Sequence, residues 1–182
     1  MQVLPRLVAV ALIHVTGVTP EAPDANTALG GEAADEILNL CTDMVNDARN
    51  SLSLAGRGAI DCVALGSPHF SATECRSLLR LISARKLAVP VYVCTSRHTL
   101  SELAIDGTDT ALADSGVEFV IDTCVVVTPI LPADEGVMMT NSAKFAHYAS
   151  GNTGYLPVFG ALADCVESAV RGEVFWEAGI WR

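Results

Sequence analysis

The chain is poor in basic residues, lacks paired-cysteine motifs and has no long apolar run, and each shortage excludes a class of protein. Eleven Lys and Arg residues stand against 21 Asp and Glu, which gives a formal net charge of −10. Such a surface repels phosphate backbones, so we predict no nucleic-acid partner. The absence of CxxC pairs excludes zinc ribbons and thioredoxin-type sites. The longest apolar run is too short to span a bilayer, so we also predict no membrane partner.

What is present is typical of a folded, reduced protein. The 182 residues are 51% hydrophobic and 18% charged, which favours one globular domain over residues 1–182. Four of the six cysteines lie within apolar patterns and behave as small hydrophobic residues. We therefore predict a cytoplasmic protein with free thiols. These four cysteines are Cys62, Cys75, Cys94 and Cys165.

The N-terminal quarter predicts one strand and one helix. The stretch "PRLVAVALIHV" has an arginine before a short apolar run, as a signal peptide does. His14 and the lack of a small-x-small cleavage site favour a buried strand over residues 7–15 instead. Apolar residues at helical spacing then predict a helix over residues 32–49.

Alternating β-rich and helical segments predict an α/β fold. Short apolar runs at 60–65, 91–95 and 117–121 each precede or follow a helical pattern. This rhythm indicates a mostly parallel sheet of four or five strands with helices on both faces. Near the C-terminus, a strand end precedes a helix for which Gly172 is a suitable C-cap.

Polar clusters follow three of these strands. They are "GSPHFS" (66–71), "TSR" (95–97) and "DTC" (122–124). Parallel strands place their carboxyl ends at one edge of the sheet, where ligands bind in such folds. We therefore expect the three clusters to form a ligand site. No GxGxxG motif follows a predicted strand, which argues against a nucleotide site.

Each cluster also has a simpler structural explanation. The first cluster is either a turn with Ser71 as helix cap or an anion site beside His69. Arg97 alone is most often a solvated arginine, and Cys124 alone is most often a buried structural thiol. Asp122 could hydrogen-bond a nearby backbone amide.

The segment "TNSAKFAHY" (140–148) concentrates donors in a few residues. Lys144 and His147 are three apart, so they share a face if the segment is helical. Together with Asn141 and Ser142, they suit carboxylate or phosphate binding. The alternative is a polar helix start capped by Asn141 or Ser142.

Taken together, these motifs resemble the C-terminal part of the catalytic large subunit of aconitase X, a family of the aconitase superfamily of iron–sulfur hydro-lyases. The resemblance covers nearly the whole chain, and the order and separation of the motifs fit the family. It rests on the stretches "HVTGVTPEAP", "ALGSPHFS", "TSR", "DTCVVV", "MTNSAKFAHYASG" and "FGALADCVESAVRG".

The resemblance implies an activity and a site. Known members of the family resemble cis-3-hydroxy-L-proline dehydratases or two-subunit mevalonate 5-phosphate dehydratases. For this chain we expect the first of these two activities. It implies that Cys124 ligates an iron–sulfur cluster and that Lys144 and His147 are catalytic. A small carboxylate substrate would be bound by the remaining polar residues of the motifs. These are Ser67, His69, Ser71, Arg97, Asn141 and Ser142.

The chain also departs from the family in two ways. Ala143 stands where the family pattern has glycine, a residue that often serves positive φ or close backbone approach. The family's large subunit extends well before Met1 and works with a small swivelling domain or subunit. The resemblance thus implies a truncated form, one piece of a split enzyme, or an anion-binding remnant that has lost catalysis. In the first two cases, the other cluster ligands would come from the N-terminal portion and swivelling domain.

Overall fold

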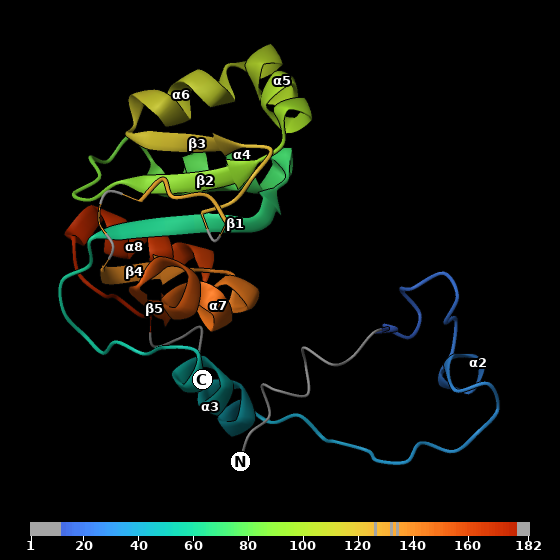
Figure 1. Cartoon of the computed structure of the whole chain (residues 1–182). Helices are drawn as coiled ribbons and strands as arrows, with labels where there is room; N and C mark the ends of the chain where they lie inside the picture. Colours follow the sequence, from blue (N-terminus) through green and yellow to red (C-terminus); the bar gives the residue numbers. More distant parts are fainter. Residues whose placement is uncertain (1–11, 126, 132, 134, 178–182) are drawn as a thin grey trace. The chain divides into compact units, whose positions relative to one another are not determined.

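A computed structural model describes residues 12–125, 127–131, 133 and 135–177 (Figure 1). The chain divides into two units, Met1–Leu40 and Cys41–Arg182. The α/β fold belongs to the second unit. That residues 1–40 share its domain stays a prediction.

The described part of the first unit, residues 12–40, contains little regular structure. Its helix α2 (Ala25–Ala28) is a single turn capped by Asp24, whose carboxylate accepts from the Thr27 N–H at 2.7 Å. The strand predicted over residues 7–15 is wrong for residues 12–15, which form no strand, and residues 7–11 lie outside the described residues. The Val15 backbone is instead used locally: its carbonyl accepts from the Thr19 N–H at 2.8 Å. A backbone committed to a turn has no group left for a ladder partner.

The helix predicted over residues 32–49 is shorter and begins later. Helix α3 spans Thr42–Ser51, and residues 32–41 are not helical. No residue of α3 is buried. Most helical stability in proteins comes from packing an apolar face, so periodicity without a packing surface is a weak signal.

The second unit is built on a five-stranded parallel sheet in the order β3-β2-β1-β4-β5 (Figure 1). This confirms the predicted α/β class. Strand β4 was not predicted. The helix after it, α7 (Ala143–Thr153), was predicted only as the alternative of a polar helix start capped by Asn141 or Ser142, and this alternative is confirmed, with Ser142 as the N-cap. The strands are β1 (Cys62–Phe70), β2 (Val91–Thr95), β3 (Val117–Ile121), β4 (Gly136–Thr140) and β5 (Tyr155–Phe159).

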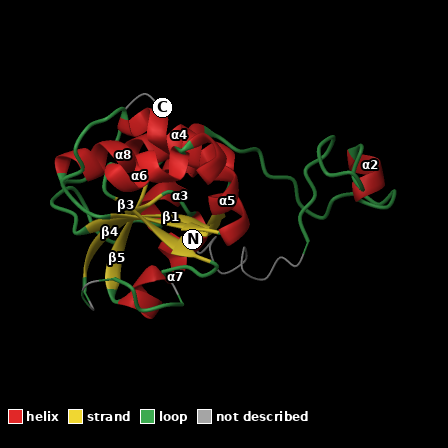
Figure 2. Cartoon of the chain, turned by 90° about the horizontal axis from the view of Figure 1, so that it is seen from above, coloured by secondary structure: helices red, strands yellow, loops and turns green. Residues whose placement is uncertain are grey.

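Helices cover both faces of this sheet. Figure 2 shows α4, α6 and α8 on one side and α7 on the other. The first side buries a large apolar core that includes Leu65, Leu78 and Val166, and the α7 side buries a smaller one around Phe145 and Tyr155. The helices are α4 (Ala72–Ile82), α5 (Arg97–Asp106), α6 (Thr108–Asp114), α7 (Ala143–Thr153) and α8 (Leu162–Arg171).

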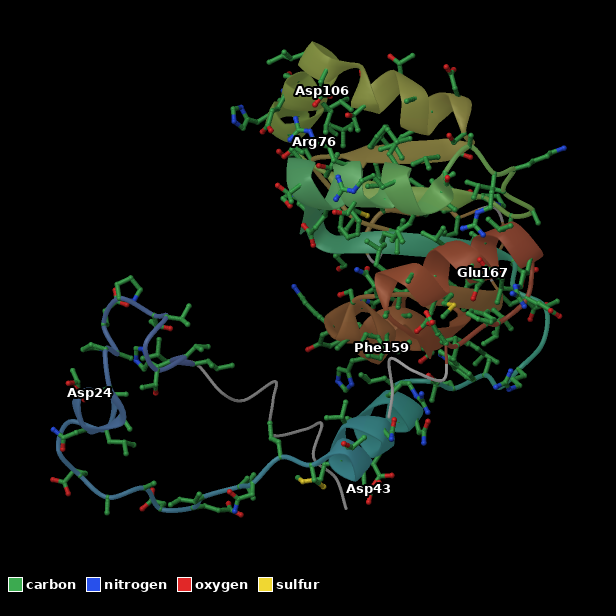
Figure 3. All side chains as sticks on the ribbon, turned by 180° about the vertical axis from the view of Figure 1, so that it is seen from behind. Asp24, Asp43, Arg76, Asp106, Phe159 and Glu167 are labelled. Carbon is green, nitrogen blue, oxygen red and sulfur yellow. The ribbon has the colours of Figure 1, made fainter. Side chains whose placement is uncertain are left out.

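Local signals fix several helix ends. Ser71 and Glu74 form the predicted capping box of α4, and Gly172, at φ 74°, ends α8 as predicted. Arg76 of α4 pairs with Asp106 of α5 at 2.7 Å, where Figure 3 shows the two side chains together. None of the helices in the described part of the chain has the length and apolar character needed to cross a membrane.

Candidate functional site

The site lies where the order of the strands reverses. Strand β1 pairs with β2 on one side and with β4 on the other, so the chain winds outward in both directions from the β1/β4 pair. In open parallel sheets, ligands bind outside the carboxyl ends of the strands at this switch point. The predicted polar clusters lie at the carboxyl ends of the strands: residues 66–70 form the end of β1, residue 95 ends β2, and residues 122–124 and 141–148 follow β3 and β4.

Strand β1 does not end at Leu65 as predicted. It continues to Phe70 with a shift of register, and Phe70 pairs with Thr95 at the end of β2. The buried Thr95 hydroxyl donates to the Phe70 carbonyl at 2.8 Å, which fixes the extension. Gly66 permits it: φ is +75°, and a Cβ would lie 2.6 Å from the Cys94 carbonyl oxygen. The turn expected for residues 66–71 is therefore an irregular strand end.

Three of the predicted site residues are in contact at the switch point. The Ser67 hydroxyl donates to the Cys124 sulfur at 3.8 Å. The Ser142 hydroxyl, at the start of α7, donates to the Ser67 carbonyl at 3.0 Å. The ends of β1 and β4 and the loop after β3 are thereby joined. Cys124 is partly exposed, unlike the fully buried Cys94.

Asp122 connects the Cys124 loop to helix α5. One carboxylate oxygen accepts from the Arg97 N–H at 2.9 Å, and the other pairs with the Arg97 guanidinium. These two bonds with Arg97 hold the pKa of the Asp122 carboxyl below its usual range. The prediction that Asp122 could bond a backbone amide is confirmed. Asp122 as a partner of Arg97 was missed, and only the pairing of β2 with β3 could have indicated it.

Cys94 lies close to this loop but differs in character. It is fully buried in β2, and burial raises the pKa of its thiol to about 11. A thiol with so high a pKa is a poor ligand because the thiolate is the form that binds metal. Within the described residues, no group of three or more His, Cys, Asp or Glu side chains is arranged to hold a metal ion. At this edge, Cys124 is the better candidate for a metal ligand.

The remaining predicted residues have different surroundings. Ser71 is used by the capping box, as its structural alternative proposed. His69, Lys144 and His147 are exposed, and the last packs edge-on against the Tyr148 ring at 4.8 Å between centroids. The roles of these residues stay predictions.

Asn141 and Ala143 flank the helix start at Ser142. The side-chain amide oxygen of Asn141, Oδ1, is buried and has no hydrogen-bond partner within the described part of the chain, which suits a contact with a further donor. Ala143 is the first residue of α7 and does not have a positive φ. Alanine is therefore accommodated where the family pattern has glycine.

A groove of about 170 Å³ lies beside the Cys124 loop. Its walls come from that loop and from the end of α7, and they hold none of the predicted site residues. The convergence of the predicted side chains on one cleft thus stays a prediction. The described wall residues are Val125, Val127, Thr128, Pro129, Leu131, Ala133, Asn152 and Thr153.

Comparison with known proteins places this fold in a family. The chain is 41% identical over 168 residues to a cis-3-hydroxy-L-proline dehydratase of Pseudomonas aeruginosa, covering 90% of this chain and 29% of that protein. It is 36% identical over 151 residues to a phosphomevalonate dehydratase large subunit of Methanothermobacter thermautotrophicus, covering 83% and 37% respectively. The chain thus spans only 29% to 37% of the length of these curated relatives.

A solved structure and a domain family agree with this placement. The holo-form crystal structure of Thermococcus kodakaraensis aconitase X superposes with a TM-score of 0.64 at 22% identity, covering 76% of this chain and 36% of that chain. At that identity the likeness concerns the fold. Residues 60–171 match the aconitase X third domain, which is more than half of the chain. The chain therefore belongs to the aconitase X family.

Proposed function

We propose that this chain carries part of the active site of an iron–sulfur-dependent hydro-lyase that dehydrates cis-3-hydroxy-L-proline. Two relatives that bear the name cis-3-hydroxy-L-proline dehydratase, at 41% and 37% identity, support this substrate. The observation that carries the proposal is the contact of Ser67, Cys124 and Ser142 at the switch point of the sheet.

The residues fit one ligand position of a cluster. Cys124 is partly exposed, and the Ser67 hydroxyl donates a hydrogen bond to its sulfur, which would help to orient a ligand there. A single cysteine cannot hold a cluster, so we assign the other ligands to polypeptide that corresponds to the rest of the relatives' length. When bound, the cluster iron supplies a Lewis acid for the leaving hydroxyl oxygen.

The chain's own residues would bind and orient the substrate. Lys144, in the first turn of α7, would hold the carboxylate and stabilise the negative charge that develops as the α proton leaves. His147 lies on the same face one turn later and is our second catalytic candidate. The side-chain amide oxygen of Asn141 would accept a hydrogen bond from a polar group of the substrate.

Relatives named phosphomevalonate dehydratase large subunit make mevalonate 5-phosphate the second candidate substrate. A phosphate dianion usually recruits several charged donors. At this edge, the predicted set offers Lys144 and Arg97, and the Arg97 guanidinium already pairs with Asp122. This shortage favours the smaller carboxylate substrate.

The proposal includes partners and a location. A substrate-bearing assembly would need the N-terminal portion of the relatives and a swivelling domain or subunit. A cytoplasmic location is supported by the six cysteines, all free thiols in the described structure.

A chimera tests the proposal. This chain replaces the matching segment of the Pseudomonas aeruginosa relative, and the product is reconstituted anaerobically with iron and sulfide. We expect visible absorbance of a cluster and dehydration of cis-3-hydroxy-L-proline, with both lost in Cys124→Ser. The unaltered relative is the positive control.

Two outcomes contradict the proposal. Turnover of mevalonate 5-phosphate alone would overturn the substrate. A folded chimera that stays colourless and inactive, while the unaltered relative works, would favour an anion-binding remnant.

A further inference from the structure

We propose that Arg97 is a positioning residue that holds the Cys124 loop through Asp122, rather than a residue that binds substrate. The inference rests on the proposed function for its meaning, because Cys124 is there a cluster ligand. The geometry on which it stands involves neither iron nor substrate.

The loop begins at a residue in an uncommon conformation. Asp122 has φ +58°, a left-handed value that few non-glycine residues adopt. Its own N–H donates to the Thr95 carbonyl at 2.9 Å, so the turn is anchored to the end of β2. Such a conformation persists where surrounding contacts over-determine it.

Arg97 supplies those contacts with both its backbone N–H and its side-chain guanidinium. Its backbone N–H, at the start of α5, donates to one Asp122 oxygen, and its guanidinium pairs with the other. The carboxylate is thus held by both oxygens at a helix N-terminus, which also favours negative charge. The guanidinium is thus oriented by Asp122 through its Nε atom.

Cys124 is two residues further along and is held from the other side as well. Its carbonyl accepts from the N–H groups of Val127 and Thr128 at 3.1 and 3.2 Å, and its sulfur accepts from Ser67. The two contacts of the Asp122 carboxylate with Arg97, here called the Asp122 clamp, hold the start of the loop, and the bonds of Cys124 hold the residues after it. Releasing the clamp should therefore loosen the sulfur without unfolding the sheet.

The first test measures the accessibility of the Cys124 sulfur in the metal-free chain. Exposed Cys41 is replaced by serine, so Cys124 is the reactive thiol while the four others stay buried. The rate of labelling by a maleimide is followed by peptide mass spectrometry. We expect Arg97→Gln to label at least about threefold faster, since loss of side-chain contacts raises local opening.

Asp122→Gly tests the loss of the carboxylate without adding backbone strain. Glycine tolerates the left-handed φ, so only the clamp is lost. We expect it to label faster than Arg97→Gln, which keeps the backbone bond from residue 97. The double variant should label no faster than Asp122→Gly alone, because Arg97 acts through Asp122.

Arg85→Gln is the matched control. It breaks another exposed arginine–carboxylate pair, Arg85 with Glu167, and should leave labelling of Cys124 unchanged. The proposal is overturned if Arg97→Gln or Asp122→Gly labels at the starting rate with an intact far-UV spectrum. Additive rates in the double variant would overturn it equally.

A second test uses the reconstituted chimera. If Arg97 binds substrate, Arg97→Gln raises KM in the Asp122→Gly background, and that result would overturn the proposal. If Arg97 acts only through Asp122, adding Arg97→Gln to the Asp122→Gly variant leaves KM unchanged. Labelling needs no cluster, so an inactive chimera would count against the proposed function and not against this clamp.

Discussion

The Ser142 hydroxyl donates to the Ser67 carbonyl at 3.0 Å while it accepts from the Phe145 N–H at 3.2 Å. One oxygen thus caps helix α7 and ties it to the end of β1. The start of the helix that carries Lys144 is thereby fixed to the strand that carries the donor to Cys124. Loss of this oxygen should cost more than an ordinary cap.

Ser142→Ala should lower the free energy of unfolding by about 2 kcal/mol, since a cap contributes about 1 and a hydrogen bond about 1. Ser96→Ala is the control, because the described side-chain bonds of Ser96, with the Thr99 N–H at 3.1 Å and the Thr99 hydroxyl at 3.0 Å, stay within the first turn of α5. It should cost about 1 kcal/mol. Urea unfolding measures both, and equal losses would contradict the cross-link.

Gly66→Ala and Gly107→Ala form a matched pair of glycine substitutions. Both residues have nearly the same φ, +75° and +73°, but only at Gly66 would a Cβ collide, at 2.6 Å from a carbonyl oxygen. We expect a loss of about 3 kcal/mol or more at Gly66 and about 1 at Gly107. Thermal and urea unfolding would refute this close packing if the two variants were equally stable.

Lys144→Ala should reduce turnover by the chimera about a hundredfold, because it removes a donor directed at developing negative charge. Lys86→Ala removes an exposed lysine before β2 and should leave turnover within about twofold, as surface substitutions usually do. Steady-state rates with cis-3-hydroxy-L-proline measure both. Undiminished turnover in Lys144→Ala would remove this residue from the site.

Glu167 should make stability depend on acid pH. Side-chain bonds from Arg85 and Arg171 lower the pKa of its carboxyl in the folded state. The resulting stability is complete above the unfolded-state pKa and is lost as pH falls through the folded-state pKa. Wild type should exceed Glu167→Gln by less than about 1 kcal/mol at pH 7, because the guanidinium groups face solvent. Urea unfolding should show the two converging in acid, and a constant difference would contradict the assignment.

Local sequence signals predicted much of the second unit. The β-rich runs at 91–95 and 117–121 are strands, the first wholly buried and the second burying Val117 and Val120, and the Ser71–Glu74 pair is a capping box. These features depend on residues a few positions apart. The parallel class followed from the alternation of such segments, and with it the shared edge of the polar clusters.

Other features depend on partners that the sequence does not identify. Residues 12–15 have strand-like composition, but the Val15 carbonyl bonds within a local turn. The Arg97–Asp122 pair needed the register of β2 against β3, in which Thr95 lies beside Ile121. Arg97 was consequently predicted as a substrate contact.

The connection between β3 and β4 affects the order in which the strands pair during folding. Strands β1 to β3 come from one continuous stretch of chain, as do β4 and β5, and the two groups meet only through Cys62–Met138 and Val63–Met139 in the described ladder. Pairings between distant segments form late because they require the closure of a long loop. Cys124 lies on the connection that closes, so its contact with Ser67 should be among the final events of folding. A nascent or half-folded chain would thus lack the Ser67–Cys124 contact on which the proposed function rests.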